Sequence, residues 1–272
     1  MEALDRLKNP PTALFTLENQ PDLRLAFDLF LASLKASVDV YNTARASQIL
    51  RRHPEDNLPS YDQRKKILAE VTGVGSVVHP MCRNSCVALT GPFMDLDHCP
   101  KCGEPKHCPI SGKYQQEFHT MPIGPILQAL SGRDPQSARR FEYRRSKTRE
   151  IIDKLLRSNF GNLPTYDDFF HGSEYLENVR NGNITNDDIV LMFSIDGAQL
   201  YAHKASDCWI YIWVIMDFSP EERYKKDFVI PGGFIPGPKK PKNLDSFLFP
   251  GLYHLAALQE SKGGLNYLEC GY

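Results

Sequence analysis

The spacing of apolar residues predicts helices in the first part of the chain. From Asp22 to about Arg52, apolar side chains recur at three- and four-residue steps, which places them on one helical face. They are Phe27, Phe30, Leu31, Leu34, Val38 and Tyr41. Pro54 and Pro59 interrupt this pattern, and a short helix from Tyr61 to Val71 follows, ended by Gly73 and Gly75.

The spacing of apolar residues changes in the last third of the chain, where β-prone runs replace the helical pattern. An apolar run from Ile189 to Phe193 ends in Ile195-Asp196-Gly197, and a second run extends from Cys208 to Phe218. The segment FVIPGGFIPGP reads as a third strand, and its proline and glycines favour an edge position or a bulge. A helix is expected from Leu244 to Gln259, with Pro250 near its first turns.

Between these regions, residues 165–186 are rich in acidic, Gly and Asn residues and look like a connection. The preceding segment ARRFEYRRSKTREIIDKLLR is expected to be helical. Its basic residues surround Phe141 and Tyr143, a composition that suits phosphate contacts and base stacking, although a solvated helix face is an equally simple interpretation. The candidate DNA-binding residues are Arg139, Arg140, Arg144, Arg145, Lys147 and Arg149.

Composition changes this picture little. The chain has 272 residues, 42% of them hydrophobic and 24% charged, which is enough for one large or two small domains. The net charge of −1 excludes a global basic field, so a nucleic acid would have to be held by local patches. No apolar run reaches the roughly 18 residues of a membrane helix, and the N-terminus lacks a signal peptide pattern. We therefore expect a soluble, intracellular protein.

The most informative feature is a cluster of cysteines. Five of the seven fall between Cys82 and Cys108. Cys82 and Cys86 form a C-x3-C pair, and a C-P-x-C-G pair at Cys99 and Cys102 follows after 12 residues. Two such pairs can bring four thiolates to the corners of a tetrahedron, which predicts a structural Zn2+ site.

Two alternatives to zinc stay open at this point. The cysteines could form disulfides, which would need an oxidising compartment, or they could be free buried thiols. Cys108, His98 or His107 could also replace one of the four ligands. The regular spacing of the pairs makes these three residues second choices.

Asp196 follows a buried-looking strand and precedes a glycine. A carboxylate there can face a cleft and help to hold Mg2+ in two-metal phosphoryl transfer. On local pattern alone, however, Asp-Gly is also a favoured hairpin turn.

Longer segments add a resemblance to a known family. CRNSCVALTGPFMDLDHCPKCGEP, FSIDGAQLY and DCWIYIWVIMDFSPEERYKKDFVIPGGFIPGPKKPKNLDSFLFPGL occur in the order found in transposases of CACTA-type (En/Spm-like) DNA transposons. The chain resembles fungal members most, from about Tyr61 to near its C-terminus. The resemblance implies a zinc-ribbon-like module followed by a ribonuclease H-like catalytic domain, with Asp196 as first residue of an Asp/Asp/Glu set that uses Mg2+ or Mn2+. It also implies transposon-end DNA as partner, association into a homo-oligomer or with another transposase chain, and a nuclear location.

The expected fold class is therefore α+β, in four regions. They are a helical N-terminal region (1–76), a zinc-binding module (77–110), a helical, basic connecting region (111–186) and a partial ribonuclease H-like domain (187–272). The chain departs from the family after the last helix, where the later acidic residues are missing and Glu269 does not fit the role. Other acids, Asp187, Asp188, Asp207, Asp217 and Asp245, are expected to be solvated.

Three functional hypotheses follow from these patterns. The leading one is a truncated, transposase-derived protein that binds zinc and DNA and is inactive alone. The second is an active DNA-cleaving transposase completed by missing sequence or by another chain. The third is a zinc-dependent interaction module that does not bind DNA.

Overall fold

The structure is a computed structural model that describes residues 2–11, 15–33, 35–51, 53–131, 135–158, 163, 165–199, 207–237 and 239–260. The contacts within the chain divide it into two compact units, Met1–Gly75 and Ser76–Asn266. Glu269 lies outside the described residues, and so does the side chain of Asp207.

The first unit is helical, as the apolar spacing predicts. Its elements are α1 (Glu2–Lys8), α2 (Pro21–Ala32), α3 (Val38–Thr43), the π-helix η1 (Ala44–Ile49) and α4 (Tyr61–Thr72). The helical pattern from Asp22 to about Arg52 is present, but it is divided into α2, α3 and η1. The chain leaves the helix at Ser33 and restarts after Ser37, whose backbone is extended. Serine competes with helical hydrogen bonding and favours such boundaries.

The helix expected from Tyr61 is confirmed, and local chemistry explains both of its ends. Ser60 and Gln63 form a reciprocal capping box at the start of α4, which satisfies two backbone N–H groups. Gly73 ends the helix in the left-handed conformation with φ of 72°, which a glycine adopts without strain.

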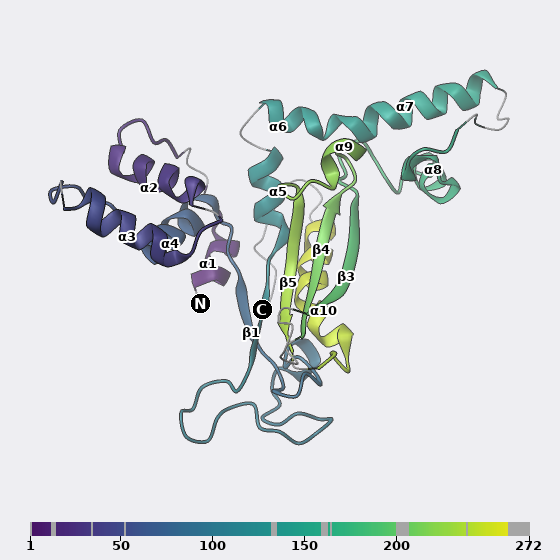
Figure 1. Cartoon of the computed structure of the whole chain (residues 1–272). Helices are drawn as coiled ribbons and strands as arrows, with labels where there is room; N and C mark the ends of the chain where they lie inside the picture. Colours follow the sequence, from purple (N-terminus) through teal and green to yellow (C-terminus); the bar gives the residue numbers. More distant parts are fainter. Residues whose placement is uncertain are drawn as a thin grey trace. The chain divides into compact units, whose positions relative to one another are not determined.

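The second unit is built on one five-stranded antiparallel sheet, shown in Figure 1, with strand order β1-β2-β5-β4-β3. The strands are β1 (Val77–Pro80), β2 (Glu117–Thr120), β3 (Leu191–Gln199), β4 (Asp207–Ile215) and β5 (Val229–Pro236). The helices are η2 (Gly91–Phe93), α5 (Ile123–Ser131), α6 (Pro135–Arg140), α7 (Glu142–Arg157), η3 (Phe169–His171), α8 (Ser173–Arg180), α9 (Pro220–Arg223) and α10 (Leu244–Glu260).

The alternation of side chains along β4 separates two hydrophobic clusters. Tyr211, Trp213 and Ile215 pack with residues of α5 and α10. Val214, together with Met216 just after the strand, packs instead with residues of α7 and α8. Because successive side chains of a strand point to opposite faces, β4 is buried on both sides near its C-terminal end. Figure 1 shows α10 lying along the sheet and α7 near the end of β4.

The sheet corrects several sequence-based expectations. Asp196 does not end a strand or form a hairpin turn, because it lies within β3 and pairs with Ile210 of β4. The third predicted strand, β5, is not an edge strand but lies between β2 and β4. The predicted irregularity is present, as a register shift between Tyr211 and Ile212 opposite β5. Helix α8 lies in the segment that was expected to be a connection.

The regional boundaries also differ from the expectation after residue 76. Strands β1 and β2 flank the cysteine region and join the same sheet as β3 to β5, so residues 77–110, 111–186 and 187–260 share one compact unit. The α+β class is confirmed, while the ribonuclease H-like fold stays a prediction.

Candidate metal centre

Two tight turns carry the four predicted zinc ligands. In the first, the Ser85 N–H donates to the Cys82 carbonyl at 2.8 Å, and Ser85 has a left-handed φ of 55°. In the second, the Gly103 N–H donates to the Cys99 carbonyl at 2.9 Å, with φ of 74° at Gly103. Each turn brings two cysteines close together, and Gly103 provides the predicted tight reversal.

The four sulfurs of Cys82, Cys86, Cys99 and Cys102 lie within 4.8 Å of one another. A tetrahedral zinc site with Zn–S bonds of about 2.3 Å has sulfur atoms about 3.8 Å apart. The Cys82 and Cys102 sulfurs are 3.5 Å apart, close to that separation and too far for a disulfide. All four cysteines are free. The donor set and its spacing therefore fit a metal ion, and zinc is the ion that such a set prefers.

Hydrogen bonds to sulfur support the same arrangement. The Asn84 backbone N–H donates to the Cys82 sulfur at 3.4 Å, and the Asn84 side chain donates to the Cys102 sulfur at 3.7 Å. Donors around thiolate ligands orient them and stabilise their negative charge.

The sulfurs differ in their affinity for protons. Burial raises the pKa of Cys82 to about 12, and burial also raises that of Cys86. Burial acts in the same direction on Cys102, but hydrogen bonds from Glu104 and Asn84 overcome it and lower its pKa to about 6. A metal ion must displace the protons of the buried pair, so metal binding at this site releases protons.

The alternative ligands lie outside the cluster. Cys108 begins a turn with the same backbone bonds as the second cysteine turn, since the Gly112 N–H donates to the Cys108 carbonyl at 2.9 Å. Ser111 stands in this turn where a second cysteine would be needed. Cys108, His98 and His107 are not in the metal-ligating group found among the described residues.

The metal centre is attached to the start of α10. The Ala88 N–H donates to Ser246 Oγ at 2.9 Å, and Thr90 Oγ1 donates to the Ser246 carbonyl at 2.8 Å. Asn243 N–H donates to the Cys86 carbonyl at 3.0 Å. These bonds join residues more than 150 positions apart. The cysteine module is therefore part of the sheet unit and not a separate domain.

Asp196 lies on an open part of the sheet. It is exposed, and its carboxylate accepts a hydrogen bond from the Gly197 N–H at 2.7 Å. A shallow hollow of about 230 Å3 is lined by Ser194, Asp196, Gly197, Ala198, Ile210 and Ile212. Asp196 is the one acidic residue in this lining.

The basic stretch from Arg139 to Arg149 does not form one DNA-facing surface. Arg144 is a correction to the prediction, because it is buried and its guanidinium donates to Asp217 at 2.7 Å. Arg140 pairs with Glu222 at 3.4 Å, and Lys147 pairs with Asp167 at 3.4 Å. Arg145 is half-buried, whereas Arg139 and Arg149 are exposed.

Sequence reasoning missed two buried ion pairs in the described part of this unit. Asp217 was expected to be solvated but is buried against Arg144. Arg223 donates to both carboxylate oxygens of Asp168, at 3.0 and 2.8 Å, and its side chain is 1% exposed. The one sequence signal that could have indicated a buried Asp217 is its position as a lone charged residue at the end of a β-prone run.

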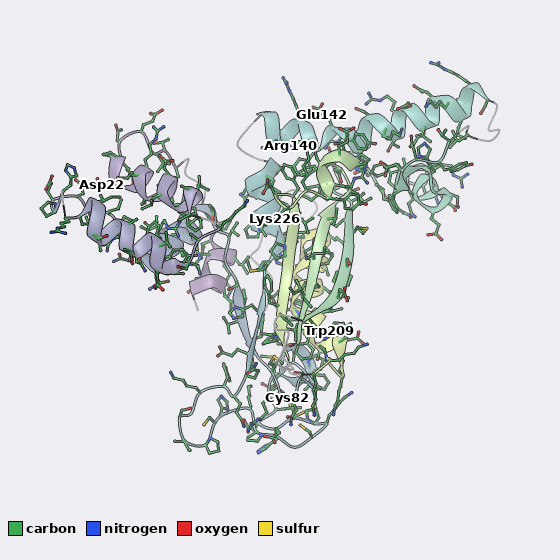
Figure 2. The ribbon with its side chains drawn as sticks, in the orientation of Figure 1. Asp22, Cys82, Arg140, Glu142, Trp209 and Lys226 are labelled. Atoms are coloured by element: carbon green, nitrogen blue, oxygen red, sulfur yellow. The ribbon has the colours of Figure 1, made fainter. Side chains whose placement is uncertain are left out.

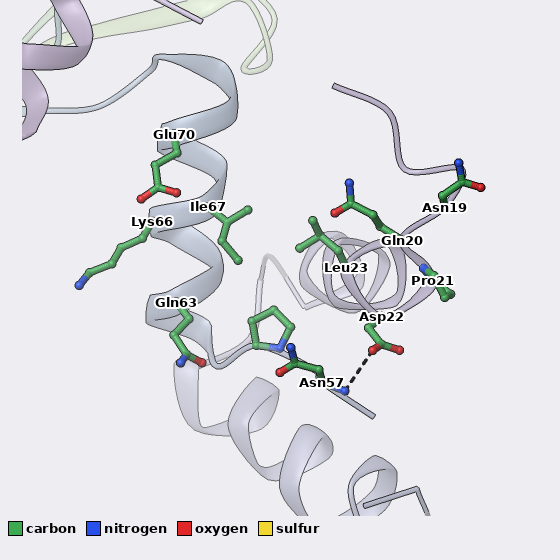
Figure 3. A pocket seen from close by; sticks show the side chains of 11 residues that line it. Asn19, Gln20, Pro21, Asp22, Leu23, Asn57, Gln63, Lys66, Ile67 and Glu70 are labelled. Atoms are coloured by element: carbon green, nitrogen blue, oxygen red, sulfur yellow. Dashed lines mark hydrogen bonds between the residues drawn. The ribbon is translucent and has the colours of Figure 1, made fainter. Parts of the chain in front are cut away.

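The N-terminal unit contains a larger cavity, of about 630 Å3, between α2 and α4 (Figure 3). Its walls include the amides Asn19, Gln20, Asn57 and Gln63, the charged residues Asp22, Lys66 and Glu70, and the apolar residues Pro21, Leu23, Pro59 and Ile67. The Asn57 N–H donates to Asp22 at 3.0 Å and closes one side. No sequence motif marks this cavity.

Comparison of the chain with protein-family models, with curated proteins and with solved structures gave no match. Among the described residues, no helix is both long and apolar enough to cross a membrane.

Proposed function

We propose that the chain is a zinc-binding and DNA-binding protein derived from a CACTA-type transposase, and that it has no catalytic activity by itself. The observation that carries the proposal is a four-cysteine metal centre in the same unit as Asp196, an exposed carboxylate that is the one acidic residue lining its hollow among the described residues. The antiparallel order of β3, β4 and β5, followed by α10, is compatible with the opening of a ribonuclease H-like domain.

The zinc ion would have a structural role. Cys82, Cys86, Cys99 and Cys102 would fill all four positions of a tetrahedral site, which leaves none for water or substrate. Metal binding would then stabilise the turns between β1 and β2. These turns contain little regular secondary structure that could hold them in place without the metal.

The surroundings of Asp196 do not fit a two-metal catalytic centre. Mg2+ takes octahedral oxygen coordination, and a pair of such ions needs several anionic ligands. The hollow beside Asp196 supplies one carboxylate, and the described residues contain no other group of three metal-ligating side chains besides the cysteines. This isolation supports the proposed lack of activity.

The test is a cleavage assay with the purified full chain, Mg2+ or Mn2+, and DNA that carries the ends of the encoding element. We expect no nicking above background. Metal-dependent nicking that is lost in Asp196→Asn but kept in Ser194→Ala would overturn the inactivity and favour an enzyme completed by another chain. Ser194 is a suitable control because it lines the same hollow.

The DNA-binding part is tested by the salt dependence of duplex binding. Phosphate contacts release counterions, so the affinity should fall steeply as salt rises. Absence of binding at low salt would favour a zinc-dependent interaction module that does not bind DNA. A protein with the proposed partner would act in the nucleus, which imaging of the tagged full chain can check.

A further inference from the structure

Five basic residues from two distant segments gather around the cysteine turns. They are Arg83, Lys101, Lys239, Lys240 and Lys242, here called the zinc-end basic surface, and all five are exposed. Arg83 lies in the first cysteine turn and Lys101 in the second. The three other lysines lie in the loop between β5 and α10.

Backbone hydrogen bonds hold this loop against the first cysteine turn. The Lys242 N–H donates to the Ser85 carbonyl at 3.2 Å, and the next residue, Asn243, donates to the Cys86 carbonyl at 3.0 Å. The Lys101 ammonium reaches the Lys242 carbonyl at 3.4 Å. The three lysines are neighbours in the sequence, and the fold brings them to the turns that carry Arg83 and Lys101.

In the Arg139–Arg149 stretch, half of the six cations are paired. Arg140, Arg144 and Lys147 each form an ion pair with a carboxylate, whereas Arg139, Arg145 and Arg149 form none among the described residues. None of the five cations at the zinc end forms an ion pair within the described part of the chain. Their charge is consequently available to an external anion.

An aromatic side chain borders the same surface. Lys240 Nζ lies 5.2 Å from the ring centroid of Trp209, and Trp209 pairs across the sheet with Gly197, the neighbour of Asp196. Figure 2 shows Trp209 and Cys82 toward one end of the unit and Arg140 toward the other. Lys240 is therefore held beside the part of β4 that pairs with Gly197 of β3.

We propose that the zinc-end basic surface binds the phosphate backbone of duplex DNA. Lysine ammonium groups bind phosphate as point charges, and several of them held on a rigid frame bind it without reading the sequence. This inference rests on the proposed DNA-binding function and names the surface responsible, in place of the basic stretch that the sequence suggested.

One competing role for the same cations is to neutralise the metal centre. A zinc ion with four thiolates carries a net charge of −2, which nearby ammonium groups would stabilise. Under that role, loss of the lysines would weaken zinc binding first, and DNA binding would change only through loss of zinc.

The experiment measures binding of the zinc-loaded full chain to a fluorescent duplex of arbitrary sequence at several salt concentrations. One variant carries Lys239→Gln, Lys240→Gln and Lys242→Gln. A second, matched in charge, carries Arg139→Gln, Arg145→Gln and Arg149→Gln. A third control carries Lys225→Gln, Lys226→Gln and Arg157→Gln, all exposed elsewhere on the unit. Zinc content and circular dichroism are recorded for each.

We expect the lysine variant to lose affinity by roughly 10-fold or more, and its slope of log affinity against log salt to fall by about 2 to 3. The two other variants should change the affinity less than about threefold, the scale of one phosphate contact. If the triple variant is misfolded, the double variant Lys239→Gln/Lys240→Gln should show a smaller loss of the same kind, because it removes two of the three cations and leaves Lys242, which contacts the first cysteine turn, unaltered.

Three outcomes would overturn the inference. If only the variant with Arg139→Gln, Arg145→Gln and Arg149→Gln lost affinity, the DNA contacts would lie on the Arg139–Arg149 stretch. The proposed DNA-binding function would then remain. Normal DNA binding by the lysine variant would overturn the inference, and a reduced zinc content in the same variant would assign the lysines to the metal centre. No binding by the unaltered protein at low salt would remove both the inference and the proposed DNA-binding function.

Discussion

Arg144 Nε lies 2.7 Å from Asp217 Oδ1, and the two side chains are only 2% and 1% exposed. The same guanidinium donates to the carbonyls of Thr185, Asn186 and Asp188, and the other Asp217 oxygen accepts the Val190 N–H at 2.7 Å. This buried pair therefore joins α7, the segment that enters β3 and the end of β4.

Breaking this pair should strongly destabilise the sheet unit. Burial raises the pKa of Asp217, whereas the hydrogen bonds from Arg144 and Val190 oppose that rise and favour the carboxylate. Removing one partner leaves the other buried without its counter-charge, which typically costs about 3 to 5 kcal/mol. We expect that loss for Arg144→Ala in urea unfolding. Arg149→Ala, on an exposed site of the same helix, should change the free energy of unfolding by less than about 0.5 kcal/mol.

A double variant gives the internal check on this pair. If Arg144→Ala and Asp217→Ala are combined, the loss should be smaller than the sum of the two single losses, because the second substitution removes the uncompensated charge. Strict additivity would mean that the two side chains do not stabilise each other.

Zinc removal should unfold the turns between β1 and β2. Structural zinc contributes on the order of 10 kcal/mol in small modules, so a chelator or Cys99→Ser should expose amides from about residue 80 to residue 108 to hydrogen exchange. Cys108→Ser is the matched control, since Cys108 begins a turn with the same backbone bonds but lies outside the cluster. Retained protection in excess chelator would refute the metal centre.

Acid should weaken the contact between α5 and α10 through His254. The Gly124 N–H donates to His254 Nε2 at 3.2 Å, and burial lowers the pKa of His254 to about 4. Because the unfolded histidine titrates near pH 6.5, the unfolded state binds more protons between these values. The stabilisation is thus complete above about pH 6.5 and is lost as the pH falls toward 4, by up to about 3 kcal/mol.

The measurement is the free energy of unfolding at pH 7.5, 5.5 and 4.5. His254→Gln keeps an acceptor for Gly124 but cannot titrate, so its stability should fall less over this range. Burial lowers the pKa of His79 to about 4 as well, and a residual decrease from His79 is therefore expected in the variant. An unchanged pH dependence in His254→Gln would contradict the assignment.

Arg64 should be important for packing in the N-terminal unit. Its guanidinium carbon lies 3.3 Å from the Phe30 ring centroid, and it also lies within 5 Å of the Tyr41 and Tyr61 rings. Removing this buried side chain leaves a cavity between α2, α3 and α4. Arg64→Ala should lower the free energy of unfolding by about 3 kcal/mol. Lys65→Ala, at an exposed neighbouring position, should have little effect on thermal unfolding.

Part of this architecture could be predicted from local patterns. The helix that begins at Tyr61, the strands around Phe193 and Trp213 and the helix after Leu244 follow from side-chain periods and end signals that need no distant contact. The four zinc ligands were predictable for the same reason, because each pair lies within one turn and the second pair has Gly103 at the position of the left-handed backbone.

The order of strands and the burial of charges were decided by tertiary structure alone. The sequence by itself determined where apolar faces and cysteine pairs occur, since these depend on neighbours a few residues away. It did not determine that β5 lies inside the sheet, that Asp196 lies within a strand, or that Arg144 faces Asp217. Those outcomes depend on pairing between residues about 14 to 115 positions apart, such as Asp196 with Ile210 and His119 with Phe234. No local spacing encodes which polar groups such pairing will bury or leave free.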